Sequence, residues 1–211
     1  MLTADGATDC LIIFTRYPTP GKTKTRLIPA LGEAGAAALQ RQMTEHTLGR
    51  AQVCQQQRSL AIEICFTGAT QAAMTTWLGP QWAYQSQGTG SLGDRLEQAF
   101  HRAEKVGYSR TVVIGIDCPA LEAAHLNQAF EQLGDRDVVL GPAADGGYYL
   151  IGLKRPVAAL FQSIAWGTET VLNQTVAAAE AAALSIAYLE VLKDVDYPRD
   201  LAVWEAVRDA C

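Results

Sequence analysis

Apolar residues along this chain form short continuous runs that alternate with segments in which apolar residues recur every three or four positions. Short continuous apolar runs bounded by turn residues are typical of strands buried on both faces of a sheet. They predict strands at residues 10–14, 60–66, 111–116, 137–140, 148–153 and 185–191. The helical spacing is typical of helices with one buried face, and it is found at residues 36–53, 69–78, 92–103, 121–133, 169–184 and 199–210.

The alternation of strands and helices predicts an α/β fold, with a mainly parallel sheet covered by helices on both faces. Ser91 and Asp94 have the spacing of a capping box and would open the helix at residues 92–103. No internal repeat and no low-complexity linker interrupts the pattern, so we expect a single domain over residues 1–211. Residues 82–87 are too polar to form a central strand.

Composition narrows the class of protein. The chain has 211 residues, 49% hydrophobic and 18% charged, which is typical of a folded globular protein. Its formal net charge of −5 argues against nonspecific binding to nucleic acid or anionic lipid. No apolar run reaches the roughly 18 residues of a membrane span, and the N-terminal residues lack the pattern of a signal peptide. The five cysteines have no metal-binding spacing and indicate reduced thiols, so we expect a cytoplasmic protein without a membrane anchor.

A basic loop follows the first predicted strand. Gly21, Lys22 and Thr23 resemble the end of a P-loop, but Arg16 stands where its first glycine should be. Prolines inside the loop lack the N–H groups with which a P-loop holds phosphate. Lys24 and Arg26 bring the loop to four cations, which two prolines and Gly21 hold in a stiff frame. At the C-terminal end of a strand, where open α/β sheets bind ligands, this loop predicts a polyphosphate site made by side chains.

A second glycine-rich stretch has the letters of a dinucleotide-binding fingerprint. Gly88, Gly90 and Gly93 give the pattern G-x-G-x-x-G, and Asp117 follows at nearly the expected distance. The fingerprint requires a buried strand directly before it, and residues 82–87 are polar. We therefore interpret these glycines as a turn or as a loop that approaches a ligand, while a Rossmann dehydrogenase stays an alternative.

Aspartates at strand ends are the candidates for holding a divalent metal beside the phosphates, because Mg²⁺ commonly uses one or two carboxylates together with phosphate oxygens. Asp117 follows the strand at residues 111–116, although it could instead cap a helix. Asp145 begins an Asp-Gly-Gly sequence that is both a turn signal and a place where backbone can approach a ligand. Asp194 and Asp196 alternate as on an extended segment and could point to one side, and Asp200 is expected to be a cap or a surface charge.

These segments together resemble the transferases associated with radical-SAM and selenodomain proteins, which belong to the nucleotide-diphospho-sugar transferase superfamily of GT-A fold and are often labelled arsenosugar biosynthesis glycosyltransferases. The basic loop is also similar to that of 2-phospholactate guanylyltransferase. Position 16 is usually lysine in the family and is arginine here. The resemblance rests on the following stretches: residues 18–27, 31–32, 92–95, 115–119, 141–148 and 194–198.

The resemblance implies a single-domain, GT-A-like three-layer α/β/α sandwich with a mixed sheet. It implies that the N-terminal loop binds the phosphates of a nucleotide. Gly88 and Gly93, as a loop that approaches a ligand, are further candidates for binding the nucleotide. The resemblance further implies that Asp117 binds Mg²⁺ or Mn²⁺ and that Asp196 is the second ligand. We expect Asp117 and Asp145 to take part in catalysis, with Asp145 near the acceptor because its Gly-Gly turn leaves room for a second substrate.

Three functions are compatible with such a site. Glycosyl transfer from a nucleotide-diphospho-sugar to a small acceptor is the one that the family label favours. Nucleotidyl transfer, of a guanylyl or cytidylyl type, would join a nucleoside monophosphate to a small phosphorylated substrate, and four cations suit a triphosphate. A nucleotide-binding protein without turnover is the third. Both chemistries need electrostatic stabilisation of developing phosphate charge.

Overall fold

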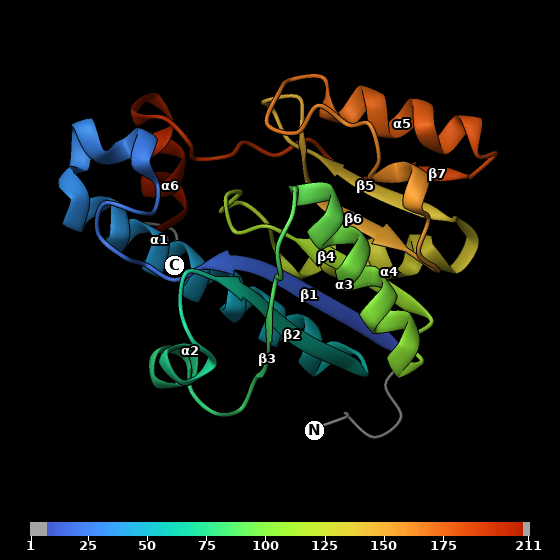
Figure 1. Cartoon of the computed structure of the whole chain (residues 1–211), viewed down its shortest axis with the longest axis horizontal. Coiled ribbons are helices and arrows are strands. Elements are labelled where there is room, and N and C mark those ends of the chain that lie inside the picture. Colours follow the sequence, from blue (N-terminus) through green and yellow to red (C-terminus); the bar gives the residue numbers. More distant parts are fainter. Residues whose placement is uncertain (1–7, 209–211) are drawn as a thin grey trace.

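The computed structural model describes residues 8–208, and these form one α/β domain built on a seven-stranded sheet (Figure 1). The strands are β1 (Asp9–Arg16), β2 (Leu60–Thr67), β3 (Ala83–Ser86), β4 (Arg110–Ile114), β5 (Val138–Pro142), β6 (Tyr148–Leu153) and β7 (Ile186–Tyr188). The helices are α1 (Ile28–Gln57), α2 (Gln71–Leu78), α3 (Leu92–Val106), α4 (Ala123–Asp135), α5 (Val171–Ala181) and α6 (Leu201–Arg208). The predictions for Met1–Asp5 and Cys211 lie outside the described residues.

The sheet has the order β3-β2-β1-β4-β6-β5-β7. Every paired neighbour is parallel except β6, which runs antiparallel to both β4 and β5. This confirms the mainly parallel, mixed sheet. It also places the C-terminal ends of β1, β2 and β4 side by side at one edge, as expected for parallel strands.

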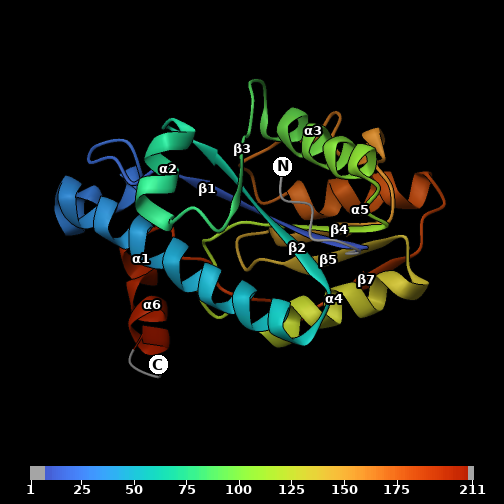
Figure 2. The same cartoon turned by 90° about the horizontal axis from the view of Figure 1, so that it is seen from below.

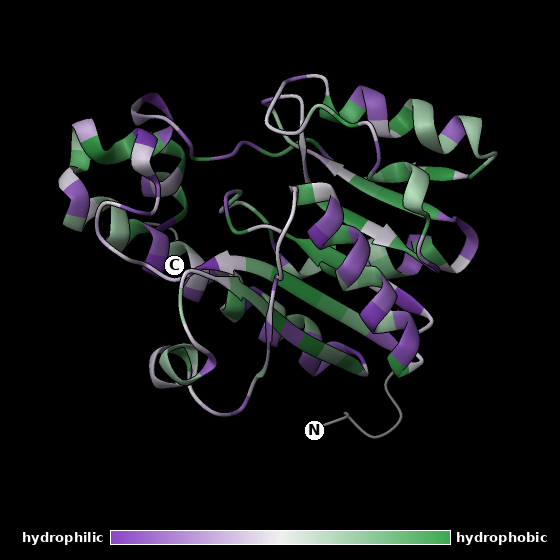
Figure 3. Cartoon of the chain, in the orientation of Figure 1, coloured by the Kyte–Doolittle hydropathy of each residue, from purple (hydrophilic) through white to green (hydrophobic). Residues whose placement is uncertain are grey.

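Helices cover both faces of the sheet (Figure 2). Alternate residues of β1 point to opposite sides: Leu11 and Ile13 pack with α1 and α4, and Cys10 and Ile12 pack with α3 and α5. The hydropathy colouring shows apolar central strands and helices whose outward surfaces are polar (Figure 3). The predicted three-layer sandwich is therefore confirmed.

Most predicted elements end within a few residues of the observed ones. The capping box at Ser91 and Asp94 is present at the start of α3. Three differences matter. Strand β4 ends at Ile114 instead of residue 116, so Asp117 lies in the loop beyond the strand. Strand β7 has only three residues, after which the chain continues without further sheet pairing except a bridge at Leu192. The polar residues 83–86 do form a strand, but β3 is at the exposed edge of the sheet.

The four cysteines within residues 8–208 are free and buried, which agrees with reduced thiols. Over the same part of the chain, none of the helices combines the length and the apolar character that crossing a membrane requires.

Candidate functional site

Lys24 is the centre of the site. It follows β1 in the basic loop, and its backbone is in the left-handed region with φ 47° and ψ 42°. A lysine in this conformation is uncommon, and such strain is found where the surrounding structure determines it. Its side chain is only 5% exposed, and Nζ donates to Asp117 Oδ1 at 2.5 Å and to the carbonyl oxygen of Val195 at 2.6 Å. The same nitrogen lies 3.6 Å from Asp196 Oδ1.

Arg26 forms the second contact between the basic loop and the aspartates. Its Nη1 donates to Asp196 Oδ2 at 2.9 Å, and its guanidinium lies over the ring of Tyr197 at 5.1 Å. Asp200 accepts from the backbone N–H of Tyr197 at 2.7 Å, which confirms that Asp200 is a cap. Two predicted phosphate-binding cations and two predicted metal ligands, about 90 to 170 residues apart in sequence, thus meet directly.

Backbone and side-chain contacts hold the Asp117 loop in place. The N–H of Val195 donates to the carbonyl oxygen of Asp117 at 2.9 Å. On the other side, His46 of α1 contacts the carbonyl oxygen of Pro119 through Nε2 at 2.9 Å. Helix α4 begins only at Ala123, with Glu122 as its N-cap, so Asp117 does not serve as a helix cap. Its side chain is half exposed and faces the site.

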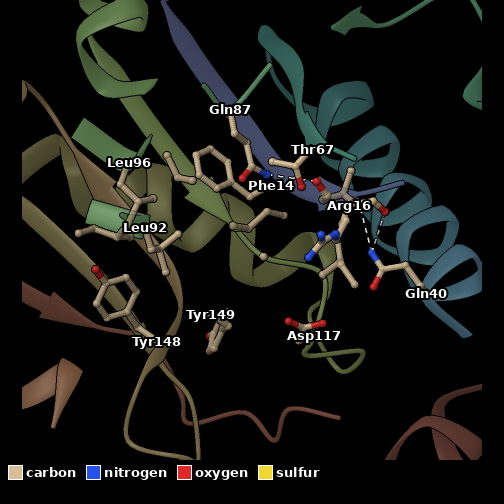
Figure 4. Close-up of a pocket in the computed structure, with 16 residues that line it drawn as sticks. Phe14, Arg16, Gln40, Thr67, Gln87, Leu92, Leu96, Asp117, Tyr148 and Tyr149 are labelled. Carbon is tan, nitrogen blue, oxygen red and sulfur yellow. Dashed lines mark hydrogen bonds between the residues drawn. The ribbon is translucent and has the colours of Figure 1, made fainter. Parts of the chain in front are cut away.

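Asp117 borders two neighbouring cavities. The first has a volume of about 350 Å³ and lies over the C-terminal ends of β1 and β4. Figure 4 shows Arg16 and Asp117 near each other on one side of it, with Tyr148 and Tyr149 toward the other side. Gln40 and Gln87 also line this cavity. Its walls between these polar groups are apolar: Phe14, Leu92, Leu96, Val113, Ile114, Ile116 and Ile151.

The second cavity has a volume of about 240 Å³ and shares Asp117, Leu92 and the two tyrosines with the first. Among the described residues that line it are four aspartates and no lysine, arginine or histidine. The aspartates are Asp117, Asp145, Asp194 and Asp196. Trp166 contributes an aromatic wall, and its ring is edge-on to Tyr148 with centroids 6.3 Å apart. The prediction that Asp194 and Asp196 face one side agrees with this lining.

The pKa values of Asp194 and Asp196 are raised above the ordinary value, mainly by burial and also by neighbouring carboxylates. Burial raises the pKa of Asp196 above its ordinary value, and so does the charge of Asp117, while Lys24 and Arg26 act in the opposite direction. Burial also raises the pKa of Asp194, with further contributions from Asp145, Asp196 and Asp200. Ionised carboxylates that are crowded in this way favour a cation or hydrogen-bond donors between them.

The structure confirms the turn at Asp145, and approach of this backbone to a ligand stays a prediction. Asp145 Oδ1 accepts from the N–H of Gly147 at 2.8 Å, as in an Asx turn, and the side chain also lines the second cavity. Gly146 has φ +89°, and a Cβ there would lie 2.2 Å from the carbonyl oxygen of Glu169. Only glycine allows this loop to pack against the segment before α5.

The other predicted glycines do not line the cavity that contains the four aspartates. Gly21 forms a turn in the basic loop with φ +74°, next to the carboxylate of Glu33. Gly88 borders an outer groove with Gln98, and lines neither cavity. Gly93 is buried, and a Cβ there would lie 2.4 Å from the carbonyl oxygen of Phe161, so close packing accounts for it. Lys22 is exposed at the surface of the loop.

Five residues of the cavities carried no functional signal in the sequence: Gln40, Gln87, Tyr148, Tyr149 and Trp166. The tyrosines follow the Asp-Gly-Gly turn, and Tyr148 was only part of a predicted strand and of the resemblance. Gln40 lies on a helix with an ordinary apolar face. Gln87 lies at the end of a polar stretch, so neither glutamine stands out in the sequence. The roles of these five residues depend on which strand ends lie side by side. The order of strands in the sheet determines this, and it is not visible in the sequence.

Comparison with known proteins agrees with the fold. The model of the family described as "Uncharacterized protein conserved in bacteria (DUF2064)" matches residues 50–168, more than half of the chain. A search of curated proteins gave no match.

Among solved structures, a protein from Desulfovibrio desulfuricans G20, named provisionally as a nucleotide-diphospho-sugar transferase, is 33% identical. The match covers 94% of this chain and 86% of that one, with a TM-score of 0.88. Two more distant structures share the fold. CMP:2-keto-3-deoxy-manno-octonic acid synthetase, solved with CTP, has a TM-score of 0.61 at 13% identity and covers 97% and 99% of the two chains. The inositol-1-phosphate CTP transferase of T. maritima has a TM-score of 0.58 at 12% identity, with 96% and 95% covered.

Proposed function

The chain belongs to the DUF2064 family of bacterial proteins and has the fold of the nucleotide-diphospho-sugar transferase superfamily, and we propose that it transfers a sugar from a nucleotide-diphospho-sugar to a small acceptor. The class of enzyme, a transferase, agrees with its structural neighbours. The narrower association with radical-SAM and selenodomain proteins stays a prediction.

The lining of the second cavity favours glycosyl transfer over nucleotidyl transfer. A sugar presents hydroxyl donors at its edge and apolar C–H groups on its faces, which suit carboxylates and aromatic rings. Asp145 and Asp194 provide the carboxylates, and Trp166 and Tyr148 provide the rings. A phosphorylated second substrate would instead bring negative charge next to Asp145 and Asp194, which make no ion pair with another described residue.

The first cavity is the place that we propose for the nucleoside. It lies beside the basic loop, so a nucleoside there would direct its diphosphate toward Arg16, Lys24 and Arg26. Lys22 is exposed on the same loop and adds to the positive potential. Because Asp117 borders both cavities, the bond between phosphate and sugar would lie next to it.

A divalent metal, Mg²⁺ or Mn²⁺, fits the residues present. Asp117 and Asp196 both approach Lys24 Nζ, so the two carboxylates already converge on one cation. No group of three or more His, Cys, Asp or Glu side chains suited to a metal is found within residues 8–208. Two carboxylates completed by substrate phosphate oxygens are the usual set for Mg²⁺. When bound, the metal would neutralise charge on the departing diphosphate.

The chain's own residues account for the remaining steps. In the structure Lys24 neutralises the carboxylates, and we propose that it exchanges them for phosphate oxygens when the donor binds. The acceptor hydroxyl then attacks the anomeric carbon, the bond from that carbon to the phosphate oxygen breaks, and the nucleoside diphosphate leaves with the electron pair. Asp145 is exposed at the second cavity and is placed to take the proton of the acceptor hydroxyl.

Nucleotidyl transfer is the second candidate, and the basic loop favours it. Arg16 and Lys22 make no ion pair with another described residue, and Lys24 and Arg26 would leave Asp117 and Asp196 when a polyphosphate binds, so all four cations would then be available to it. A substrate phosphate would then attack the α-phosphate of a nucleoside triphosphate and release pyrophosphate.

Identification of the leaving group tests the proposal. The protein is incubated with Mg²⁺ and either nucleotide sugars or nucleoside triphosphates, with and without small acceptors, and the products are identified by mass spectrometry. We expect nucleoside diphosphate from a nucleotide sugar, with loss of turnover in Asp145→Asn. Acceptor-dependent pyrophosphate release would contradict glycosyl transfer, and tight binding of nucleotide without either product would contradict enzymatic transfer.

A further inference from the structure

Gln87 is held rigidly at the edge of the first cavity. It directly follows β3, and its side chain is buried. The amide nitrogen donates to the carbonyl oxygen of Thr15 at 3.1 Å and to that of Cys65 at 2.9 Å. Its backbone N–H donates to the carbonyl oxygen of Phe66 at 2.9 Å. The residue is therefore fastened to the C-terminal ends of both β1 and β2.

These contacts determine which way the amide faces. An amide nitrogen has two hydrogens, and both are directed to backbone carbonyls. A flip of the amide would set Oε1 against those carbonyl oxygens, so the orientation is fixed. Figure 4 shows the amide nitrogen directed toward the backbone of β1, with the oxygen on the other side. None of the residues from 8 to 208 donates a hydrogen bond to Gln87 Oε1. Because Gln87 lines the first cavity and its amide nitrogen is directed to the backbone, we infer that Oε1 is a fixed acceptor at this cavity.

The surroundings of this acceptor suit a planar ring. Phe14, Leu92 and Leu96 form apolar walls next to Gln87 (Figure 4). A nucleobase has apolar faces and a polar edge, and it can place that edge against Gln87 while its faces contact these walls. The inference rests on the proposed function, in which the first cavity takes the nucleoside.

The bases differ in what they present to such an acceptor. Adenine, guanine and cytosine carry an exocyclic amino group, which donates, whereas uracil and thymine carry carbonyl oxygens at the corresponding positions. We propose that Gln87 Oε1 is a specificity-determining group that selects nucleotides whose base carries an exocyclic amino group. A carbonyl facing this fixed acceptor would be left without a donor, which corresponds to about a ten- to hundredfold loss of affinity.

Matched nucleotides test this selection. Dissociation constants are measured by calorimetry with Mn²⁺ for CDP against UDP, ADP against IDP and GDP against IDP. GDP and IDP differ only in the 2-amino group. In the other two pairs the amino group is replaced by a carbonyl, and the neighbouring ring nitrogen changes from an acceptor to an N–H donor. For the pair that contains the tightest ligand, we expect the amino-bearing nucleotide to bind at least tenfold more tightly. In Gln87→Met this ratio should fall toward one, while Gln85→Met, in the exposed part of β3, should keep it.

The outcomes separate the two proposals. Equal affinities within every pair in the unaltered protein would overturn the role of Gln87 and leave nucleotide binding intact. Tighter binding of UDP than of CDP would overturn it as well. A protein that binds none of these nucleotides would overturn the proposed function together with this inference. If Gln87→Met does not fold, the affinity ratios measured for the unaltered protein still decide whether amino-bearing bases are selected.

Discussion

At the scale of single residues, Lys24 connects the metal and phosphate hypotheses. Its ammonium bridges Asp117 and Asp196 at 2.5 and 3.6 Å, the two carboxylates that would hold a divalent metal. In the proposed site the lysine and the metal would therefore compete for the same oxygens until a phosphate binds the lysine. Metal binding would then depend on nucleotide binding.

Replacing Lys24 with methionine tests this competition. We expect Lys24→Met to bind Mn²⁺ in the absence of nucleotide more tightly than the unaltered protein, because the carboxylates lose their resident cation. Affinity for a nucleoside diphosphate should fall by about ten- to a hundredfold, the effect of losing one charge-assisted contact worth roughly 1.5–3 kcal/mol. Calorimetry measures both.

Lys22→Met is the matched control, because Lys22 is exposed on the same loop. It should leave the affinity for Mn²⁺ alone unchanged. If Lys24→Met and the unaltered protein bind Mn²⁺ equally without nucleotide, the ammonium does not occupy the metal position.

At the scale of elements, a buried group of charged side chains joins the N-terminal ends of β1 and β4 to the end of α1. It lies at the opposite end of these strands from the site. Asp9 has a side chain that is only 3% exposed. It accepts from Arg58 Nη2 at 2.6 Å, and from Arg110 Nε at 2.6 Å and Nη2 at 3.0 Å. Removing one partner of such a group leaves buried charge without compensation.

Asp9→Ala should therefore reduce the free energy of unfolding by about 3–5 kcal/mol, measured by urea denaturation. Glu63→Ala is the control. Glu63 pairs with Arg102 at 3.0 Å, but both side chains are about a quarter exposed, so the expected loss is within about 1 kcal/mol. Equal losses in the two variants would show that the Asp9 group is not a major contributor to stability.

The sequence predicted most helices and strands because interactions between neighbouring residues determine where they begin and end. The capping box at Ser91, the apolar run of β1 and the turn at Asp145 each depend on neighbouring residues. The edge strand β3 was missed because its residues are polar, and pairing with β2 on one side suffices to form it. Asp117 was expected at a strand end, and its contact with Lys24 could not be predicted, because it joins residues 93 positions apart.

The same reason limited the prediction of the site. The basic loop and the aspartates could be identified in the sequence because their charged residues are clustered or follow predicted strands. Gln87 did not, because an uncharged amide has no pattern of its own, and its role depends on the carbonyls of β1 and β2 beside it. Gly93 matched a phosphate-binding pattern, yet its packing against Phe161 explains it equally well.

At the scale of the whole molecule, the last part of the chain completes the site. After β7 it crosses from the α5 side of the molecule to α6, which lies beside α1 (Figure 1). On the way it carries Asp194 and Asp196 to the cavities. His46 of α1 supports this arrangement, because it contacts Pro119 and its ring is edge-on to Trp204 of α6 at 5.7 Å.

The position of His46 predicts a dependence of stability on pH. Burial lowers the pKa of His46 below its ordinary value of 6.5. The unfolded chain then takes up a proton more readily than the folded one, so stability is fully present above that value and declines as the pH falls through it. We expect the decline in Tm between pH 7 and pH 5 to be smaller in His46→Gln. His101→Gln, at an exposed position, should follow the unaltered protein.

The central claim is that one nucleotide sugar spans both cavities across Asp117. A crystal structure with Mn²⁺ and a nucleotide-diphospho-sugar, with the metal located by its anomalous scattering, tests this most directly. We predict the base in the first cavity beside Gln87, the diphosphate on Lys24 and Arg26, Mn²⁺ between Asp117 and Asp196, and the sugar in the second cavity against Asp145 and Trp166. A sugar outside the second cavity, or a metal held away from Asp117, would contradict the account.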